Sequence, residues 1–183
     1  MRIISGNLKG KKINPPKDKL TRPLKDMVKE SIFNILEHSN EINHKIENSI
    51  VLDLFSGSGS FGLECISRGA KYVFFNENYN EAIRVLEKNI HNLKCENKCK
   101  VIKISCFDLI QSFEESVDLV FLDPPFKEEK INQLIELVLQ MKILKKDGLM
   151  IIHRNKQIKE DLSPKLKIID IRHYGLSKII FGN

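Results

Sequence analysis

Four consecutive residues, Asp123-Pro124-Pro125-Phe126, form the most specific chemical signal in the chain, and they follow an apolar run. Two prolines after a buried strand fix a rigid, extended turn. The Asp123 carboxylate and the Pro124 carbonyl could then accept both N–H bonds of an exocyclic amine, while Phe126 offers a face on which a base can stack. Such bonds raise the electron density on nitrogen, so the pattern predicts an amine-activating site that works mainly by positioning. The alternative is a plain Asp-Pro turn that ends a strand.

A glycine-rich turn at 57–59 follows a second apolar segment and precedes a helical pattern. Strand, glycine turn and helix together form the geometry that binds a nucleotide-like ligand at backbone N–H groups. The spacing Gly57-x-Gly59-x-x-Gly62 matches the dinucleotide fingerprint, and Glu77 lies near the expected acidic position. However, Asp53 inside the strand would repel a pyrophosphate and suits a ligand with positive charge, such as S-adenosylmethionine. Alternatively, Asp53 caps the N–H groups of its own loop.

The elements that would position these residues follow from hydrophobic periodicity. Strands alternate with helices and end in a hairpin at Tyr174-Gly175, which predicts an α/β fold with a mainly parallel sheet and one antiparallel strand. Strands are expected at residues 50–55, 71–76, 100–106, 117–122, 149–153 (after a turn at 146–148), 166–172 and 177–181. Helices are expected from residue 24, between 61 and 69, at 79–90 and at 131–141. The last helix should bury Ile131, Leu134, Ile135, Val138 and Met141.

Four acidic residues, Asp53, Glu77, Asp108 and Asp123, lie in or shortly after four of the predicted strands, at the edge where such sheets bind ligands. Asp53 faces the methionine end of the ligand in this interpretation, and Glu77 could accept hydrogen bonds from ribose hydroxyls. Asp108 could accept one from an adenine amino group, with Phe107 packing on the ring. The alternative for each carboxylate, above all for Asp108, is a helix N-cap or a surface charge.

Composition limits the class of protein. A chain of 183 residues with 42% hydrophobic residues predicts one domain, with room for a small appendage. No apolar run approaches the roughly 18 residues of a membrane span, and the first residues lack the apolar segment of a secretory signal. The four cysteines are not arranged as a disulfide framework, which favours free thiols and a cytoplasmic location.

Positive charge is concentrated near the N-terminus. Residues 1–30 hold nine basic and three acidic residues, which accounts for the entire net charge of +6. A neutral body with a basic arm is typical of a protein that grips nucleic acid, although a solvated, lysine-rich tail would look the same. Lys25 and Lys29 lie one helical turn apart and are expected on one face. The residues predicted to bind nucleic acid are Arg2, Lys9, Lys11, Lys12 and Arg22.

The arm itself is expected to contain two short strands, at residues 2–5 and 11–13, joined by turns that contain Gly6 and Gly10. In the helix that follows, Thr21 could act as the N-cap and Pro23 would fit the first turn.

The segments VLDLFSGSGSFGLECISRGA and FLDPPF, with Glu77 between them, resemble the class I S-adenosylmethionine-dependent methyltransferases. The segments RIISGNLKGKKI and TRPLKDMVKESIFNIL narrow the resemblance to the RsmD family, which methylates guanine N2 in small-subunit (16S) rRNA. The resemblance implies a Rossmann-like, seven-stranded sheet with an N-terminal β-hairpin extension that helps to grip RNA. It also implies S-adenosyl-L-methionine as cofactor, rRNA within an assembling or assembled small ribosomal subunit as partner, no membrane partner, and a monomer.

On this basis the chain divides into a basic hairpin extension at 1–20 and a methyltransferase domain at 21–183. The predicted cofactor-binding residues are Asp53, Phe55, Ser56, Gly57, Gly59, Glu77, Phe107 and Asp108, and the catalytic ones are Asp123, Pro124, Pro125 and Phe126.

Three positions depart from the family pattern. Leu8 stands where an aromatic residue is usual, Leu24 where the family has Thr, and His153-Arg154 where a Glu is frequent. His153 is interpreted as structural or RNA-facing, with a base near the site as the alternative.

Other functions remain open on the residues alone. His91, Cys95 and Cys99 share a spacing that could hold zinc, but a turn at Asn97-Lys98 and the lack of a fourth ligand argue against a metal. Within enzymes, the rivals are a methyltransferase for DNA adenine N6 or for a protein glutamine, and a nicotinamide-dependent oxidoreductase. Outside the enzymes, the alternative is a non-catalytic RNA-binding module.

Overall fold

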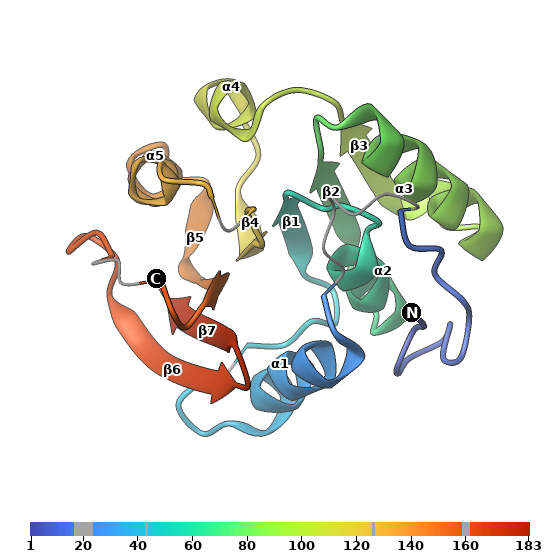
Figure 1. Cartoon of the computed structure of the whole chain (residues 1–183), viewed down its shortest axis with the longest axis horizontal. Coiled ribbons are helices and arrows are strands. Elements are labelled where there is room, and N and C mark those ends of the chain that lie inside the picture. Colours follow the sequence, from blue (N-terminus) through green and yellow to red (C-terminus); the bar gives the residue numbers. More distant parts are fainter. Residues whose placement is uncertain (17–23, 43, 126, 159–161) are drawn as a thin grey trace.

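The computed structural model describes residues 1–16, 24–42, 44–125, 127–158 and 162–183. Within these residues a seven-stranded sheet has the order β3-β2-β1-β4-β5-β7-β6 (Figure 1). The strands are β1 (Ile50–Leu54), β2 (Tyr72–Asn76), β3 (Cys99–Ile102), β4 (Val117–Leu122), β5 (Leu144–Asn155), β6 (Ile168–Tyr174) and β7 (Ser177–Gly182). The helices are α1 (Asp26–His38), α2 (Ser60–Ser67), α3 (Asn80–Leu93), α4 (Cys106–Ser112) and α5 (Ile131–Gln140), with a 3₁₀ turn η1 (Glu96–Lys98).

Strand direction confirms the predicted topology. The pairs among β1 to β5 are parallel, whereas β7 pairs antiparallel with both β5 and β6. The register places Leu54 of β1 beside Leu122 of β4, and Leu122 in turn beside Ile152 of β5. The carboxyl ends of the central strands therefore lie together at one edge of the sheet, where ligands bind in folds of this kind.

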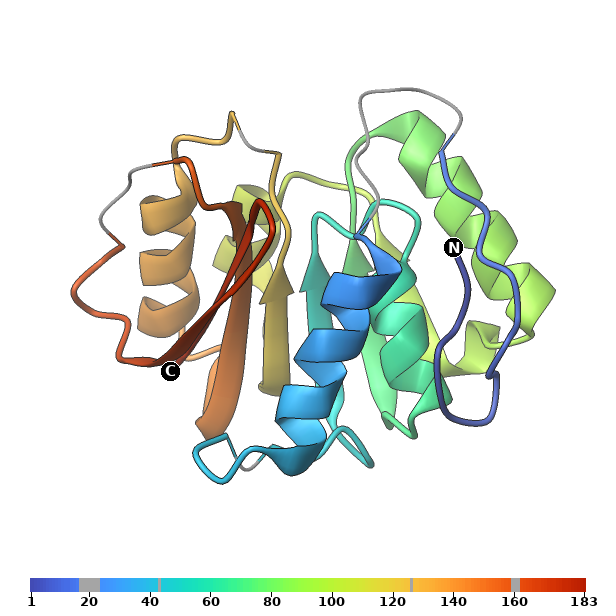
Figure 2. The same cartoon turned by 60° about the horizontal axis from the view of Figure 1, so that its bottom comes forward.

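Both faces of the sheet are covered, which explains why its central strands read as continuous apolar runs. Val51 of β1 packs in a core formed with α1, α2 and α3, whereas its neighbour Leu52 packs in a second core formed with α4 and α5. Figure 2 shows the two sets of helices on opposite sides of the strands. Within the described ranges, no helix is long and apolar enough to cross a bilayer.

A row of three aromatic rings joins α1, α2 and β4. The ring centroids of Phe33 and Phe61 lie 5.1 Å apart, and those of Phe61 and Phe121 lie 3.9 Å apart in a stacked arrangement. Since α2 follows the glycine turn and Phe121 comes two residues before Asp123, this packing fixes the two predicted corners relative to each other.

The N-terminal segment has the predicted hairpin path but not two full strands. A single antiparallel bridge pairs Arg2 with Lys12, and the N–H of Ile3 donates to the carbonyl of Lys11 at 2.9 Å. The segment runs beside α3 (Figure 2), where the N–H of Asn14 donates to the buried side chain of Asn89 at 2.9 Å.

Two strand predictions need correction. The third strand ends at Ile102 rather than Cys106, because Ser105 caps α4 by accepting the N–H of Asp108 and so starts a helix there. The fifth strand begins at Leu144, and the expected turn at 146–148 lies within an irregularity of its pairing with β4.

Two helix predictions are also wrong in detail. Helix α1 begins at Asp26, with Lys25 as its N-cap residue, so it starts later than expected. Thr21 and Pro23 lie outside the described residues. Helix α5 buries Ile131, Leu134, Ile135 and Val138 as predicted, but Met141 comes after its last residue and is 46% exposed.

Candidate active site

The Asp123-Pro124-Pro125 corner lies directly beyond β4 and next to the end of β1. The N–H of Asp123 points to the carbonyl of Leu54 at 3.5 Å, and Leu54 is followed within three residues by Gly57. Pro124 is buried and Pro125 is exposed, whereas Phe126 lies outside the described residues. The glycine turn and the aspartate-proline corner therefore lie next to each other at the carboxyl edge of the sheet. We call this place, between the glycine turn and Asp123, the mouth of the site.

The glycine turn needs glycine for two different reasons. Gly59 adopts a φ of +80°, in the left-handed region that favours glycine, just before α2. A Cβ on Gly62 would lie 2.3 Å from the ring of Phe75, so only glycine lets α2 pack this closely on β2. Both features belong to a strand–turn–helix unit, the geometry that binds nucleotide-like ligands in folds of this kind.

Glu77 lies beside this turn, at the end of β2. One of its carboxylate oxygens accepts the N–H of Gly57 at 2.8 Å. The other accepts the N–H groups of Asn78 and Tyr79 at 2.9 and 3.0 Å. These bonds hold the carboxylate beside the turn, and the ribose-binding role of Glu77 stays a prediction.

Asp53 is 1% exposed, and its carboxylate accepts the N–H of Gly62 at 3.0 Å. This hydrogen bond is the contact expected if Asp53 caps an N–H group of its own loop, which was the alternative interpretation of this residue. Burial raises the pKa of the Asp53 carboxyl well above its usual value, an effect opposed by the Gly62 hydrogen bond and reinforced by the negative charges of Asp123 and Glu77. The three carboxyl groups thus lie close enough to affect one another's charge, and together they form an acidic edge.

Phe55 and Ser56 continue the chain from β1 into the turn. Phe55 has a φ of +58°, a strained value for a residue with a side chain, and it is half-buried. The Ser56 hydroxyl donates to the carbonyl of Asp53 at 2.6 Å and lies 3.1 Å from the carbonyl of Asn76. Ser56 thereby ties the turn to both β1 and β2.

Phe107 and Asp108 lie in the first turn of α4. The hydroxyl of Ser105 donates to the Asp108 carboxylate at 2.8 Å and accepts the Asp108 N–H, so Asp108 takes part in the cap of its own helix. Phe107 is half-buried and Asp108 is exposed. Their predicted contact with an adenine ring stays a prediction.

His153 lies near the predicted catalytic corner, where it faces Asp123 from β5. Because it is buried, it is not RNA-facing, whereas its structural interpretation and its alternative position near the site both agree with this contact. The Nδ1 atom lies 2.8 Å from Asp123 Oδ1, and Nε2 lies 2.9 Å from the hydroxyl of Ser177. Next to it, the fully buried Arg154 donates to the carbonyls of Pro125 and Glu128 at 3.4 and 3.1 Å. The sequence signal was that Asp123 and His153 each follow four consecutive apolar residues.

Comparison with known proteins agrees with this geometry. A family model described as Conserved hypothetical protein 95 matches residues 1–183. The chain is 36% identical to ribosomal RNA small subunit methyltransferase D of Haemophilus influenzae over 159 residues, which cover 85% of this chain and 79% of that protein. It belongs to the RsmD family of methyltransferases.

Solved structures share the fold over nearly the whole length. HI0767 of Haemophilus influenzae is 32% identical with a TM-score of 0.79, over 99% of this chain and 96% of that one. The yhhF protein of Escherichia coli is 25% identical with a TM-score of 0.84, over 100% of this chain and 96% of that one. The Rossmann-like sheet predicted from the RsmD resemblance is therefore confirmed.

Most of the basic arm of this RsmD-family chain is available to a partner. Arg2, Lys9, Lys11 and Lys12 are exposed, and Arg22 lies outside the described residues. Lys29, which was counted with the basic residues near the N-terminus, is not available in the same way. Its side chain is buried, and Nζ lies 3.5 Å from Glu64 Oε2.

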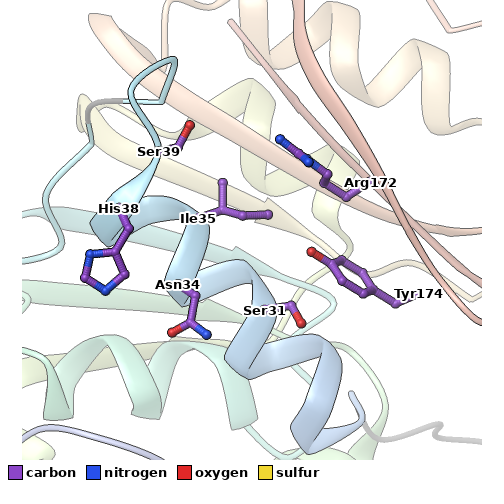
Figure 3. Close-up of a pocket in the computed structure, with 7 residues that line it drawn as sticks. All are labelled: Ser31, Asn34, Ile35, His38, Ser39, Arg172 and Tyr174. Carbon is purple, nitrogen blue, oxygen red and sulfur yellow. The ribbon is translucent and has the colours of Figure 1, made fainter.

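A groove of about 540 Å³ lies between α1 and β6, away from the predicted site residues (Figure 3). Arg172 and Tyr174 of β6 face the α1 side, and Arg172 is paired with Asp170 at 2.7 Å. The other lining residues are Ser31, Asn34, Ile35, His38 and Ser39.

The candidate zinc residues are engaged elsewhere. His91 Nδ1 lies 2.9 Å from Glu96 Oε1, while Cys95 and Cys99 are buried with their thiols directed at the carbonyls of Ile90 and Cys95. In the part of the chain that the structure describes, no three His, Cys, Asp or Glu side chains come together as a metal site.

Proposed function

We propose that the chain transfers a methyl group from S-adenosylmethionine to the exocyclic N2 amine of a guanine in small-subunit rRNA. One observation carries the proposal: Asp123 and the glycine turn adjoin, with the Asp123 N–H directed at Leu54 of the strand that leads into the turn. A methyl donor at the turn and an amine at Asp123 would then be neighbours. The name of the Haemophilus influenzae relative supports rRNA as the substrate class.

The acidic edge suits this donor better than a dinucleotide. Asp53, Glu77 and Asp123 lie close enough to affect one another electrostatically, and such a site would repel a pyrophosphate. The ammonium and sulfonium groups of S-adenosylmethionine would instead offset the negative charge. In this assignment Glu77 holds the ribose hydroxyls and Asp53 acts on the methionine end.

The acceptor must reach this edge, so the guanine leaves its stack. The Asp123 carboxylate and the Pro124 carbonyl then accept the two N–H bonds of the amine. The donor would supply its sulfonium methyl to the in-line nitrogen, with the S–C bond breaking as the N–C bond forms and S-adenosylhomocysteine leaving. The Asp123 carboxylate would accept the proton that the nitrogen loses. Because Asp123 sits at the end of a rigid strand and before two prolines, most of the rate enhancement comes from orientation. The substrate is rRNA within an assembling or assembled subunit.

The test compares Asp123→Ala with Asp147→Ala, which removes an exposed carboxylate near the opposite edge of the sheet. Asp123→Ala should lower turnover on small ribosomal subunits by about 10²-fold or more, with little change in S-adenosylhomocysteine affinity measured by calorimetry. Asp147→Ala should leave both quantities unchanged. Near-normal turnover of Asp123→Ala would refute the assigned role of the corner.

Product analysis separates the rival substrates. Methylated subunits digested to nucleosides should contain N2-methylguanosine, whereas duplex DNA and protein should remain unlabelled. N6-methyladenine in DNA or methylglutamine in protein would contradict the assigned substrate. If the protein binds NADH tightly and does not bind S-adenosylhomocysteine, the result would instead favour an oxidoreductase.

A further inference from the structure

The imidazole of His153 joins the catalytic corner to the β6–β7 hairpin. Its Nδ1 lies 2.8 Å from Asp123 Oδ1, and its Nε2 lies 2.9 Å from Ser177 Oγ. The side chain of His153 is 6% exposed, compared with 19% for Asp123. Both ring nitrogens are therefore engaged by groups on the two strands that flank β5.

The hydrogen-bonding roles follow from the chemistry of the partners. An ionised carboxylate only accepts, so Nδ1 must carry the proton that points to Asp123. A serine hydroxyl can donate or accept. Ser177 therefore donates to Nε2 when His153 is neutral and accepts from it when His153 is charged. In either charge state the bond from Nδ1 to Asp123 is preserved.

That bond restricts the orientation of the Asp123 carboxylate. Leu122 pairs with Ile152 in the parallel sheet, so Asp123 and His153 are the next residues on adjacent strands. With Oδ1 held by a buried ring, rotation of the carboxyl group is limited, and its second oxygen keeps one direction. Fixing an acceptor in this way is the property that catalysis by orientation requires.

We propose that His153 is a positioning residue that orients the Asp123 carboxylate toward the target amine. The proposal rests on the amine-accepting role of Asp123 proposed above. It predicts that His153 acts on turnover and not on the affinity for either substrate, because the imidazole contacts Asp123 and Ser177 rather than the ligands assigned to the mouth. It also predicts that only the Nδ1 side of the ring matters for the reaction rate.

Two amide substitutions separate the two sides of the ring. In His153→Asn the amide nitrogen takes roughly the place of Nδ1 and can still donate to Asp123, whereas in His153→Gln it takes roughly the place of Nε2. On small ribosomal subunits, His153→Ala and His153→Gln should each lose about 10²-fold in kcat, and His153→Asn should stay within about threefold of the parent. The KM for S-adenosylmethionine and for subunits should not change.

Parallel measurements keep the outcomes distinct. Thermal midpoints and S-adenosylhomocysteine affinities identify a variant that is only misfolded; if His153→Ala does not fold, the Asn and Gln pair decides. Equal losses in Asn and Gln, or no loss in either, would overturn the positioning role while Asp123→Ala remains inactive. Full turnover of Asp123→Ala would instead overturn the proposed function itself.

Discussion

Lys29 and Glu64 form an ion pair in which both side chains are fully buried, with 3.5 Å between Nζ and Oε2. Lys29 also donates to the carbonyl of Arg2 at 2.8 Å. Glu64 accepts the N–H groups of Ile4 and Ser5 at 2.8 and 2.9 Å. The pair thus links α1 and α2 to the N-terminal segment. Lys29, which was counted among the basic residues near the N-terminus, therefore stabilises the fold.

Removal of Lys29 should destabilise the protein. Lys29→Ala leaves the buried Glu64 carboxylate with less compensating charge, and we expect the free energy of unfolding to fall by about 3 kcal/mol. Lys25→Ala is the matched control, because Lys25 is exposed one turn earlier and should change stability by less than about 0.5 kcal/mol. Urea unfolding followed by circular dichroism measures both. Equal effects of the two variants would contradict the structural role of Lys29.

Asp53 should make stability depend on pH. Because burial raises its pKa in the folded state, the folded protein keeps this proton to a higher pH than the unfolded chain, in which the ordinary value of 3.8 applies. The stability that the protonated carboxyl contributes is therefore lost as pH rises above that value toward the raised pKa. Asp53→Asn cannot titrate, so the unfolding free energy of the parent should fall relative to that of the variant across this window.

The same substitution tests the assigned ligand charge. A cationic ligand beside Asp53 favours the ionised carboxylate, so at a pH where the free protein keeps the Asp53 proton, binding of S-adenosylmethionine should release it. Calorimetry in buffers of different ionisation enthalpy measures this release. The Asp53→Asn variant should bind S-adenosylmethionine more weakly and release fewer protons. Identical proton release by the two proteins would show that the Asp53 carboxyl group does not lose a proton when the ligand binds.

The parts of the fold that local sequence determines were predictable. The bounds of β4 were predicted correctly, because its apolar run is buried on both faces and the two prolines after Asp123 end it. The third strand was predicted too long because Cys106 continues an apolar pattern, whereas the cap from Ser105 to Asp108 decides in favour of a helix. Here a short polar motif outweighed hydrophobic periodicity.

Contacts between distant segments were not predictable in the same way. Helical spacing placed Lys29 on a face with Lys25, but its partner Glu64 comes from another helix. The contact of His153 with Asp123 likewise requires that β5 lie next to β4, which single-sequence patterns do not specify. The positions of Asp53 and Glu77 at one edge were predictable, because one lies within and the other directly follows a strand that meets this edge.

The exposed side chains of Lys11 and Lys12 should contribute to RNA affinity through phosphate contacts, which release counterions. Lys11→Gln with Lys12→Gln should weaken binding to small-subunit rRNA and reduce the slope of log affinity against log salt by about 1.5, since each lost contact is worth about 0.7 to 0.9. Lys142→Gln with Lys146→Gln is the matched control, because these exposed lysines lie near the amino end of β5, at the opposite edge from the mouth. Filter binding over a range of salt concentrations measures both slopes. If the arm variant and the control variant change the slope equally, the arm makes no phosphate contacts of its own and its charge acts only through the net charge of the protein.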